Sequence, residues 1–107
     1  MTNFEEYTLS NCEVNLAGIK WTHKKSKKQY NFFIKGEGED DIPELWIKDI
    51  NGNKLMTTYT IEAINSSCFI TFESVKYKVL LISNKTELSV MELETPSGQV
   101  ECFEGTI

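Results

Sequence analysis

The stretch YKVLLISNKTELSVMEL, residues 77–93, decides the fold that we predict for this chain. Within it Tyr77, Val79 and Leu81 fall on one face and Ile82 falls on the other. A polar break at residues 83–86 then separates this run from a second apolar run that ends at Leu93. Alternation with a period of two, rich in Val, Ile, Tyr and Thr, is typical of strands with one buried face. The stretch therefore predicts two strands joined by a reverse turn.

Similar alternating runs recur on both sides of this hairpin. They predict strands over residues 12–16, 19–24, 29–35, 45–50, 54–64, 68–73 and 100–103. The connections are too short for a crossover helix, so the sheet cannot be parallel, and closure into a barrel would remove its exposed edges. We predict one all-β domain over residues 1–107. It is a single antiparallel up-and-down (meander) barrel of about eight strands, with at most a short helical turn near the N-terminus.

Turn residues punctuate these runs. Asn51-Gly52 predicts a two-residue type I′ turn, because both central positions of that turn need a positive φ. The Asn65-Ser66-Ser67 run and the Thr95-Pro96-Ser97-Gly98 run predict two further reverse turns.

Several of these motifs together resemble the small bacterial lipocalin-like domains. Gly18 shortly precedes Trp21 on an early strand, Tyr30 and Phe32 form a Tyr-x-Phe pair, and a Thr-Tyr-Thr-Ile run lies at residues 58–61. The usual Gly-x-Trp of such domains is Gly18-Ile19-Lys20-Trp21 here, with one residue inserted. The resemblance covers nearly the whole chain and implies a barrel whose lumen holds one small ligand.

Charge and composition limit the partners. The 107 residues carry a formal charge of −5, which disfavours nucleic acid and anionic membranes because both would repel the protein. No apolar run is long enough to span a membrane as a helix, and we expect no signal peptide, because the first residues contain neither a positive region nor an apolar run. We expect a cytoplasmic protein, or a secreted one if a leader has been removed. Cys12, Cys68 and Cys102 contain no Cys-x-x-Cys pair, and we expect reduced thiols, with a single disulfide as the alternative.

Catalytic motifs are absent from the sequence. His23 is the single histidine, and the sequence places no nucleophile or orienting carboxylate beside it, so we expect it to be exposed and without a catalytic role. The acidic run at residues 37–41 lacks the Asp-x-Asp-x-Asp-Gly spacing of a calcium loop. We therefore predict that the protein is not an enzyme and has neither a cofactor nor a metal site.

Two functions from different classes remain. The first is a lipocalin-like binding protein that holds a small apolar or aromatic ligand in the barrel lumen. The residues predicted to line that lumen are Trp21, Tyr30, Phe32, Tyr59, Phe72 and Tyr77. The second is a small acidic interaction module, such as an inhibitor, an immunity protein or a phage counter-defence protein, that binds a basic protein partner. The residues predicted for that surface are Phe33, Glu37, Glu39, Asp40, Asp41 and Trp46. The sequence also leaves open a homodimer formed through an unclosed sheet edge.

Overall fold

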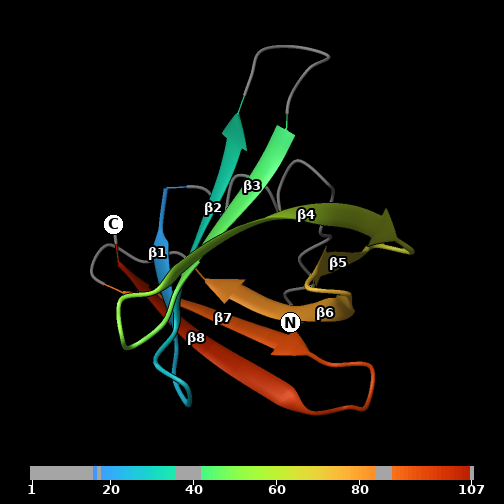
Figure 1. Cartoon of the computed structure of the whole chain (residues 1–107). Helices are drawn as coiled ribbons and strands as arrows, with labels where there is room; N and C mark the ends of the chain where they lie inside the picture. The colour runs from blue at the N-terminus through green and yellow to red at the C-terminus, as the bar shows by residue number, and fades with distance from the viewer. Residues whose placement is uncertain (1–15, 17, 36–41, 84–87, 107) are drawn as a thin grey trace.

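The structure is a computed structural model, and it describes residues 16, 18–35, 42–83 and 88–106. It contains eight strands, which follow one another around a closed antiparallel barrel (Figure 1). They are β1 (Lys20–His23), β2 (Gln29–Lys35), β3 (Ile42–Lys48), β4 (Lys54–Ile64), β5 (Ser67–Phe72), β6 (Val75–Ser83), β7 (Ser89–Glu94) and β8 (Val100–Thr106). β8 pairs with β1 and closes the barrel. The predicted all-β meander barrel is thus confirmed.

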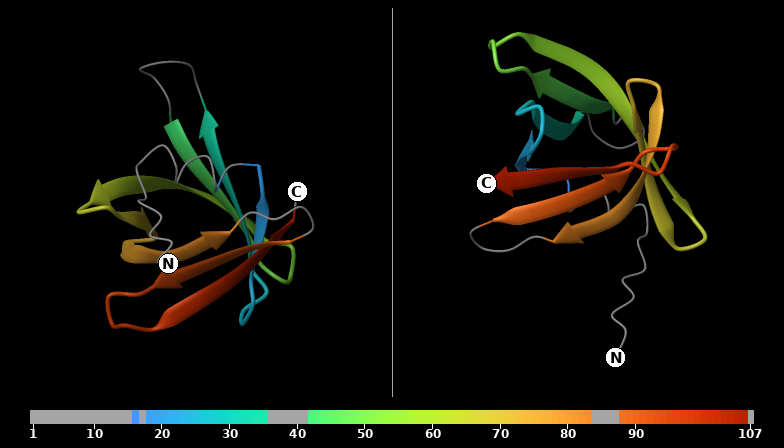
Figure 2. Two further views of the ribbon diagram at one scale, coloured as in Figure 1. Left: turned by 180° about the vertical axis from the view of Figure 1, so that it is seen from behind. Right: turned by 90° about the horizontal axis from the view of Figure 1, so that it is seen from below.

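Because each strand reverses direction, the connections alternate between the two ends of the barrel. We call one of them the tip end; it carries the connections at residues 24–28, 49–53, 73–74 and 95–99. At the other end of the barrel, the paired ends of β2 and β3 project beyond the neighbouring strands (Figure 1). The views from behind and from below show how the strands wrap around a common interior (Figure 2).

The interior is a single apolar core to which every strand contributes. Trp21 is fully buried, and its indole Nε1 donates a hydrogen bond of 3.2 Å to the carbonyl oxygen of Leu16. Gly105 lies opposite Trp21 on β8, and a Cβ atom there would come within 2.8 Å of Cε3 of Trp21. The absence of a side chain at Gly105 therefore makes room for the indole ring.

The hairpin between β6 and β7 departs from strict alternation. The register shifts between Val79 and Leu81, so that Ile82 is buried at 4% exposure while Leu81 is 39% exposed. An extra residue in one strand reverses which face the following side chains occupy. The prediction that Leu81 shares the inner face of Val79 is therefore wrong, and Ile82 takes the inward position.

The turn at Asn51-Gly52 is a turn, but not of the predicted type. Gly52 has a φ of +86°, and its N–H donates to the carbonyl oxygen of Asp49, while the N–H of Asp49 donates to the carbonyl oxygen of Asn53. This is a longer hairpin loop in which a tight turn is followed by a left-handed glycine. The Asp49 carboxylate explains the difference, because its Oδ1 accepts the N–H groups of both Asn51 and Asn53, each at 2.9 Å.

Positive φ at both central positions, as a type I′ turn requires, occurs instead at two connections without glycine. Asn65 and Ser66 have φ values of 50° and 66°, and Glu73 and Ser74 have values of 50° and 64°. The pairings of Ile64 with Ser67 and of Phe72 with Val75 leave only these residues in each connection.

Two other sequence predictions concern the N-terminal part and the cysteines. The predicted helical turn and most of the strand predicted at 12–16 lie outside the described residues; Leu16, which is described, is not part of a strand. Cys68 is disulfide-bonded, so the prediction of reduced thiols is wrong for it, while Cys102 is a free thiol. Spacing in the sequence carries no information on which Cα atoms approach within reach of a disulfide. Within the described residues, no helix combines the length and the apolar character that crossing a membrane requires.

Candidate functional site

The six residues predicted to line the lumen do meet inside the barrel. Five of them are buried and Tyr77 packs against them. The rings of the other five, without Trp21, contact one another, with centroids 5.8 Å apart for Tyr30 and Phe72, 5.1 Å for Phe32 and Tyr59, and 4.8 Å for Phe72 and Tyr77. These tilted, edge-on and stacked contacts are those of a packed aromatic core. The side chains that would bind a ligand are thus already in contact with each other.

Two tyrosine hydroxyls inside the barrel are influenced by the surrounding protein groups. Tyr59 donates a hydrogen bond of 3.2 Å to the carbonyl oxygen of Phe33. Burial raises the pKa of Tyr30 to about 12, with smaller contributions from Glu73, Tyr77 and Glu101. In the described part of the chain, every buried side-chain nitrogen or oxygen has a hydrogen-bond partner. The described core therefore contains no orphaned polar atom that a ligand would have to satisfy.

A different site lies on the outer wall of β1 to β4. The strand register aligns Lys20, Asn31, Trp46 and Met56 in one row across these strands. We call the surface formed by Lys20, Phe33, Trp46, Lys48, Lys54 and Met56 the Trp46 face. A hollow of about 370 Å³ opens on it, which Gln29 and Asn31 also help to line.

Two aromatic rings of the Trp46 face are open to solvent because of strand alternation. Leu45 and Ile47 point into the core at 0% and 6% exposure, which turns the side chain of Trp46 outward, where it is 40% exposed. Phe33 follows the buried Phe32 and is 46% exposed. The Nε1 atom of Trp46 donates to Oε1 of Glu44 at 3.2 Å, which steadies the orientation of the indole ring.

The lysines of this face form no ion pair within the part of the chain that the structure describes. Lys48 and Lys54 are direct cross-strand partners at the base of the β3–β4 hairpin. No carboxylate of the described residues lies within 4.0 Å of the ammonium groups of Lys20, Lys48 or Lys54, whereas Lys76 pairs with Glu62 at 3.6 Å elsewhere on the barrel. Two like charges directly opposite each other on neighbouring strands repel. The arrangement is suited to receiving an anionic group.

The carboxylate of Asp49, which follows Lys48 in the sequence, already accepts hydrogen bonds within its own turn. Burial acts to raise its pKa, but hydrogen bonds from Asn53 and Asn51, together with nearby Lys28, lower the pKa below its ordinary value.

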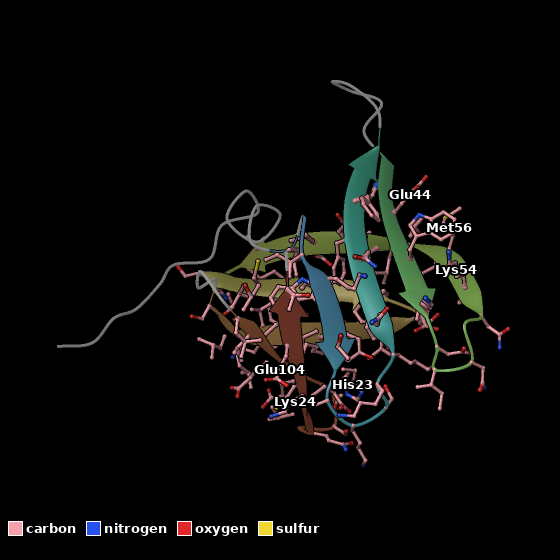
Figure 3. The ribbon with its side chains drawn as sticks, turned by 90° about the vertical axis from the view of Figure 1, so that its left-hand side faces the viewer. His23, Lys24, Glu44, Lys54, Met56 and Glu104 are labelled. Atoms are coloured by element: carbon pink, nitrogen blue, oxygen red, sulfur yellow. The ribbon has the colours of Figure 1, made fainter. Side chains whose placement is uncertain are left out.

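Figure 3 shows Glu44, Met56 and Lys54 on one side of the β3–β4 pair, apart from His23 and Lys24 on the β1–β2 hairpin.

His23 forms a second polar cluster at the tip end, and the expectation that it is exposed without a carboxylate partner is wrong. Its side chain is 13% exposed, and its Nε2 lies 2.7 Å from Oε2 of Glu101. The N–H of Ser26 donates to Nδ1 at 3.1 Å, so the neutral ring carries its proton on Nε2 and donates it to Glu101. Sequence reasoning missed this pair because 78 residues separate its members.

The contacts of this cluster connect the β1–β2 turn to β8. Ser26 Oγ lies 2.7 Å from Nδ1 of His23, a spacing that a nucleophile and its base also show. The same oxygen, however, accepts the N–H of Lys28 at 3.3 Å. Ser26 also does not line the adjacent hollow of about 340 Å³, which opens beside His23 and Glu101. The geometry is that of a clamp between the β1–β2 turn and β8.

The residues predicted for partner binding are only partly covered by the structure. Phe33 and Trp46 lie on the Trp46 face, whereas Glu37, Glu39, Asp40 and Asp41 lie outside the described residues. The described residues contain no group of three His, Cys, Asp or Glu side chains placed to hold a metal ion.

Sequence reasoning missed the lysines that surround Trp46. A signal for two of them was present, because Lys48 and Lys54 flank the Asn51-Gly52 turn and a hairpin there brings them face to face. Lys20 joins them only through the pairing of β1 with β2.

Comparisons of this chain with models of protein families, with curated proteins and with solved structures found no significant match to any of them.

Proposed function

We propose that the protein is a non-enzymatic interaction module that binds a protein partner through the Trp46 face. The observation that carries this proposal is the hollow on that face, where two solvent-exposed aromatic rings stand beside lysines that form no ion pair with a carboxylate of the described residues. Exposed tryptophan is the residue type most often responsible for binding energy at protein interfaces. A sheet holds such side chains in place before binding, so little ordering is needed when the partner arrives.

Barrel closure supports recognition by side chains. A partner that binds by adding a strand needs an unpaired sheet edge, and β1 and β8 pair with each other here. For the same reason, a homodimer formed through an open edge gains no support. The outer wall of β1 to β4 is then the natural place for contact.

The lumen ligand implied by the lipocalin-like resemblance has less support. Tyr30, Phe32, Phe72 and Tyr77 contact one another where a ligand would lie. Native mass spectrometry of the purified protein distinguishes the two functions: a retained small molecule, seen as added mass, would favour the lumen.

The disulfide of Cys68 favours an oxidising compartment over the cytoplasm that the sequence suggested.

The proposed function is tested with a matched pair of variants. Trp46→Ala removes the exposed indole, and Leu80→Ala removes an equally exposed apolar side chain from β6, outside the Trp46 face. The partner is isolated from source cells with the unmodified protein, purified, and titrated against all three proteins. We expect Trp46→Ala to weaken binding by about thirtyfold or more, the effect of a typical interface anchor. Leu80→Ala should leave binding unchanged. An equal loss of affinity in both variants, or no loss in either, would contradict the proposal.

A further inference from the structure

We propose that the partner segment that docks on the Trp46 face is acidic. It lays an apolar side chain against Trp46 and Met56 and places its carboxylates among Lys20, Lys48 and Lys54. This inference rests on the proposed function and adds the charge and the anchor chemistry of the partner. It departs from the basic partner predicted from the acidic run at residues 37–41, which lies outside the described residues.

The sign of the charge follows from the lysines. Lys48 and Lys54 oppose each other directly, with no carboxylate of the described residues within ion-pair distance. Their mutual repulsion disfavours the free protein slightly. A carboxylate seated between them replaces that repulsion with two attractions, so the binding of an acidic segment gains from a strain that the free protein carries. Lys20 extends the positive region to β1, on the other side of the hollow.

The apolar anchor follows from the middle of the face. Met56 is the cross-strand partner of Trp46 and is 48% exposed. Trp, Phe and Met are enriched in the centres of protein interfaces, and the flexible thioether of Met adapts to the shape of its partner. The N–H of the Trp46 ring is already donated to Glu44, so the faces of the ring, rather than its polar edge, remain for the partner.

An acidic polypeptide suits this face better than a nucleic acid, although both are anionic. The protein as a whole carries a charge of −5, and a chain with one phosphate per nucleotide is repelled more strongly than a segment with a few carboxylates. The lysines surround one hollow and do not follow a track along which a nucleic acid backbone could run.

The inference is tested with synthetic peptides, so that it does not depend on identifying the natural partner. The probes are an array of short peptides with one Leu, Phe or Trp flanked by Glu and Asp. Matched peptides carry Gln and Asn, or Lys, in place of the acids, and a single-stranded oligothymidine competes in solution. We expect binding to the acidic peptides alone, lost in Trp46→Ala and weakened by added salt.

Two lysine variants separate charge from shape. Lys48→Gln and Lys54→Gln should each weaken the binding of acidic peptides by about two- to fivefold, the effect of one exposed ion pair. Each should also raise the Tm of the free protein by about 1–4 °C, since the repulsion between the two lysines is gone. A purely structural role for these lysines predicts no change in peptide binding. Lys76→Gln, on the β6 side of the barrel, is the matched control that should leave peptide binding unchanged.

The outcomes distinguish this inference from the proposed function. Preference for neutral or basic peptides, still dependent on Trp46, would overturn the acidic partner and leave the binding face intact. Displacement of bound peptide by the oligothymidine at equal concentration would also overturn it, in favour of a nucleic acid. Peptide binding that is indifferent to Trp46→Ala would overturn both proposals.

Discussion

Phe32 and Phe33 are neighbours in the sequence and the same residue type, yet they occupy opposite environments. Phe32 is 1% exposed and makes edge-on contacts with Tyr59 and Phe72, with centroids 5.1 and 6.2 Å apart. Phe33 is 46% exposed and lines the hollow on the outer wall. The pleat of one strand thus supplies both the core of the barrel and its candidate binding surface.

The difference between these two environments lies in whether the rings already have partners. Rings inside the barrel are in contact with each other, so their apolar surface is removed from water on folding. The rings on the outer wall keep much of their surface in water until something covers it. Stability should therefore depend on the inner set, and binding on the outer set.

The largest predicted effect tests the difference between the inner and outer rings directly. Phe32→Ala should lower the free energy of unfolding by about 3–5 kcal/mol, since it leaves a cavity in the aromatic core. Phe33→Ala should change it by less than about 1 kcal/mol, because the ring is half exposed. Chemical denaturation of both variants measures the two values. Similar losses in the two variants would mean that the inner and outer faces are not as distinct as the structure indicates.

A smaller effect sharpens the account of the inner face. Gly105→Ala adds a methyl group against the side chain of Ile19 and within 2.8 Å of the Trp21 ring, so these side chains must shift to admit it. We expect a loss of about 1–3 kcal/mol, the usual result of overpacking a core. Thr106→Ala, at the next and exposed position of β8, serves as the control. Thermal unfolding followed by circular dichroism measures the loss of stability in Gly105→Ala. An unchanged Tm for this variant would contradict the close packing of Trp21 on β8.

The smallest effect is confined to alkaline solution. Burial first, and the nearby Glu73, Tyr77 and Glu101 next, raise the pKa of Tyr30 to about 12, so the neutral phenol is favoured in the folded state. Its contribution to stability is complete below the unfolded pKa near 10 and is lost as the pH rises through about 12. The pKa of Tyr77 is raised by burial in the same direction.

Tyr30→Phe removes the ionisable group and keeps the ring. Its stability should fall less steeply than that of the unmodified protein between pH 10 and about 12, and the two curves should run parallel near neutral pH. Denaturation measured across this range tests the point. Parallel curves throughout would show that Tyr30 ionises as freely in the folded protein as in the unfolded one.

Local sequence patterns were sufficient for the eight strands from β1 to β8, although not for the strand predicted at 12–16, and for much of the inward set. Alternation identified Trp21, Phe32 and Tyr59 as core residues and left Phe33 outside, because side chains of a strand alternate with a fixed period. It did not decide the side of Trp46, because residues 45–50 are apolar on both faces. The same rule failed after Val79, since a bulge adds a residue whose position the local sequence does not announce. It also failed at Asn51-Gly52, where the carboxylate of Asp49 stabilises a longer loop.

The sequence by itself determined that this protein is an antiparallel barrel, because alternation and short turns are local properties and leave little other choice of fold. Tertiary structure alone decided the disulfide of Cys68, the pairing of His23 with Glu101, and the meeting of Lys20 with Trp46, Lys48 and Lys54. Each of these depends on which strands become neighbours and in what register. That is set by closure of the whole sheet around its core, and no single segment of the chain contains it.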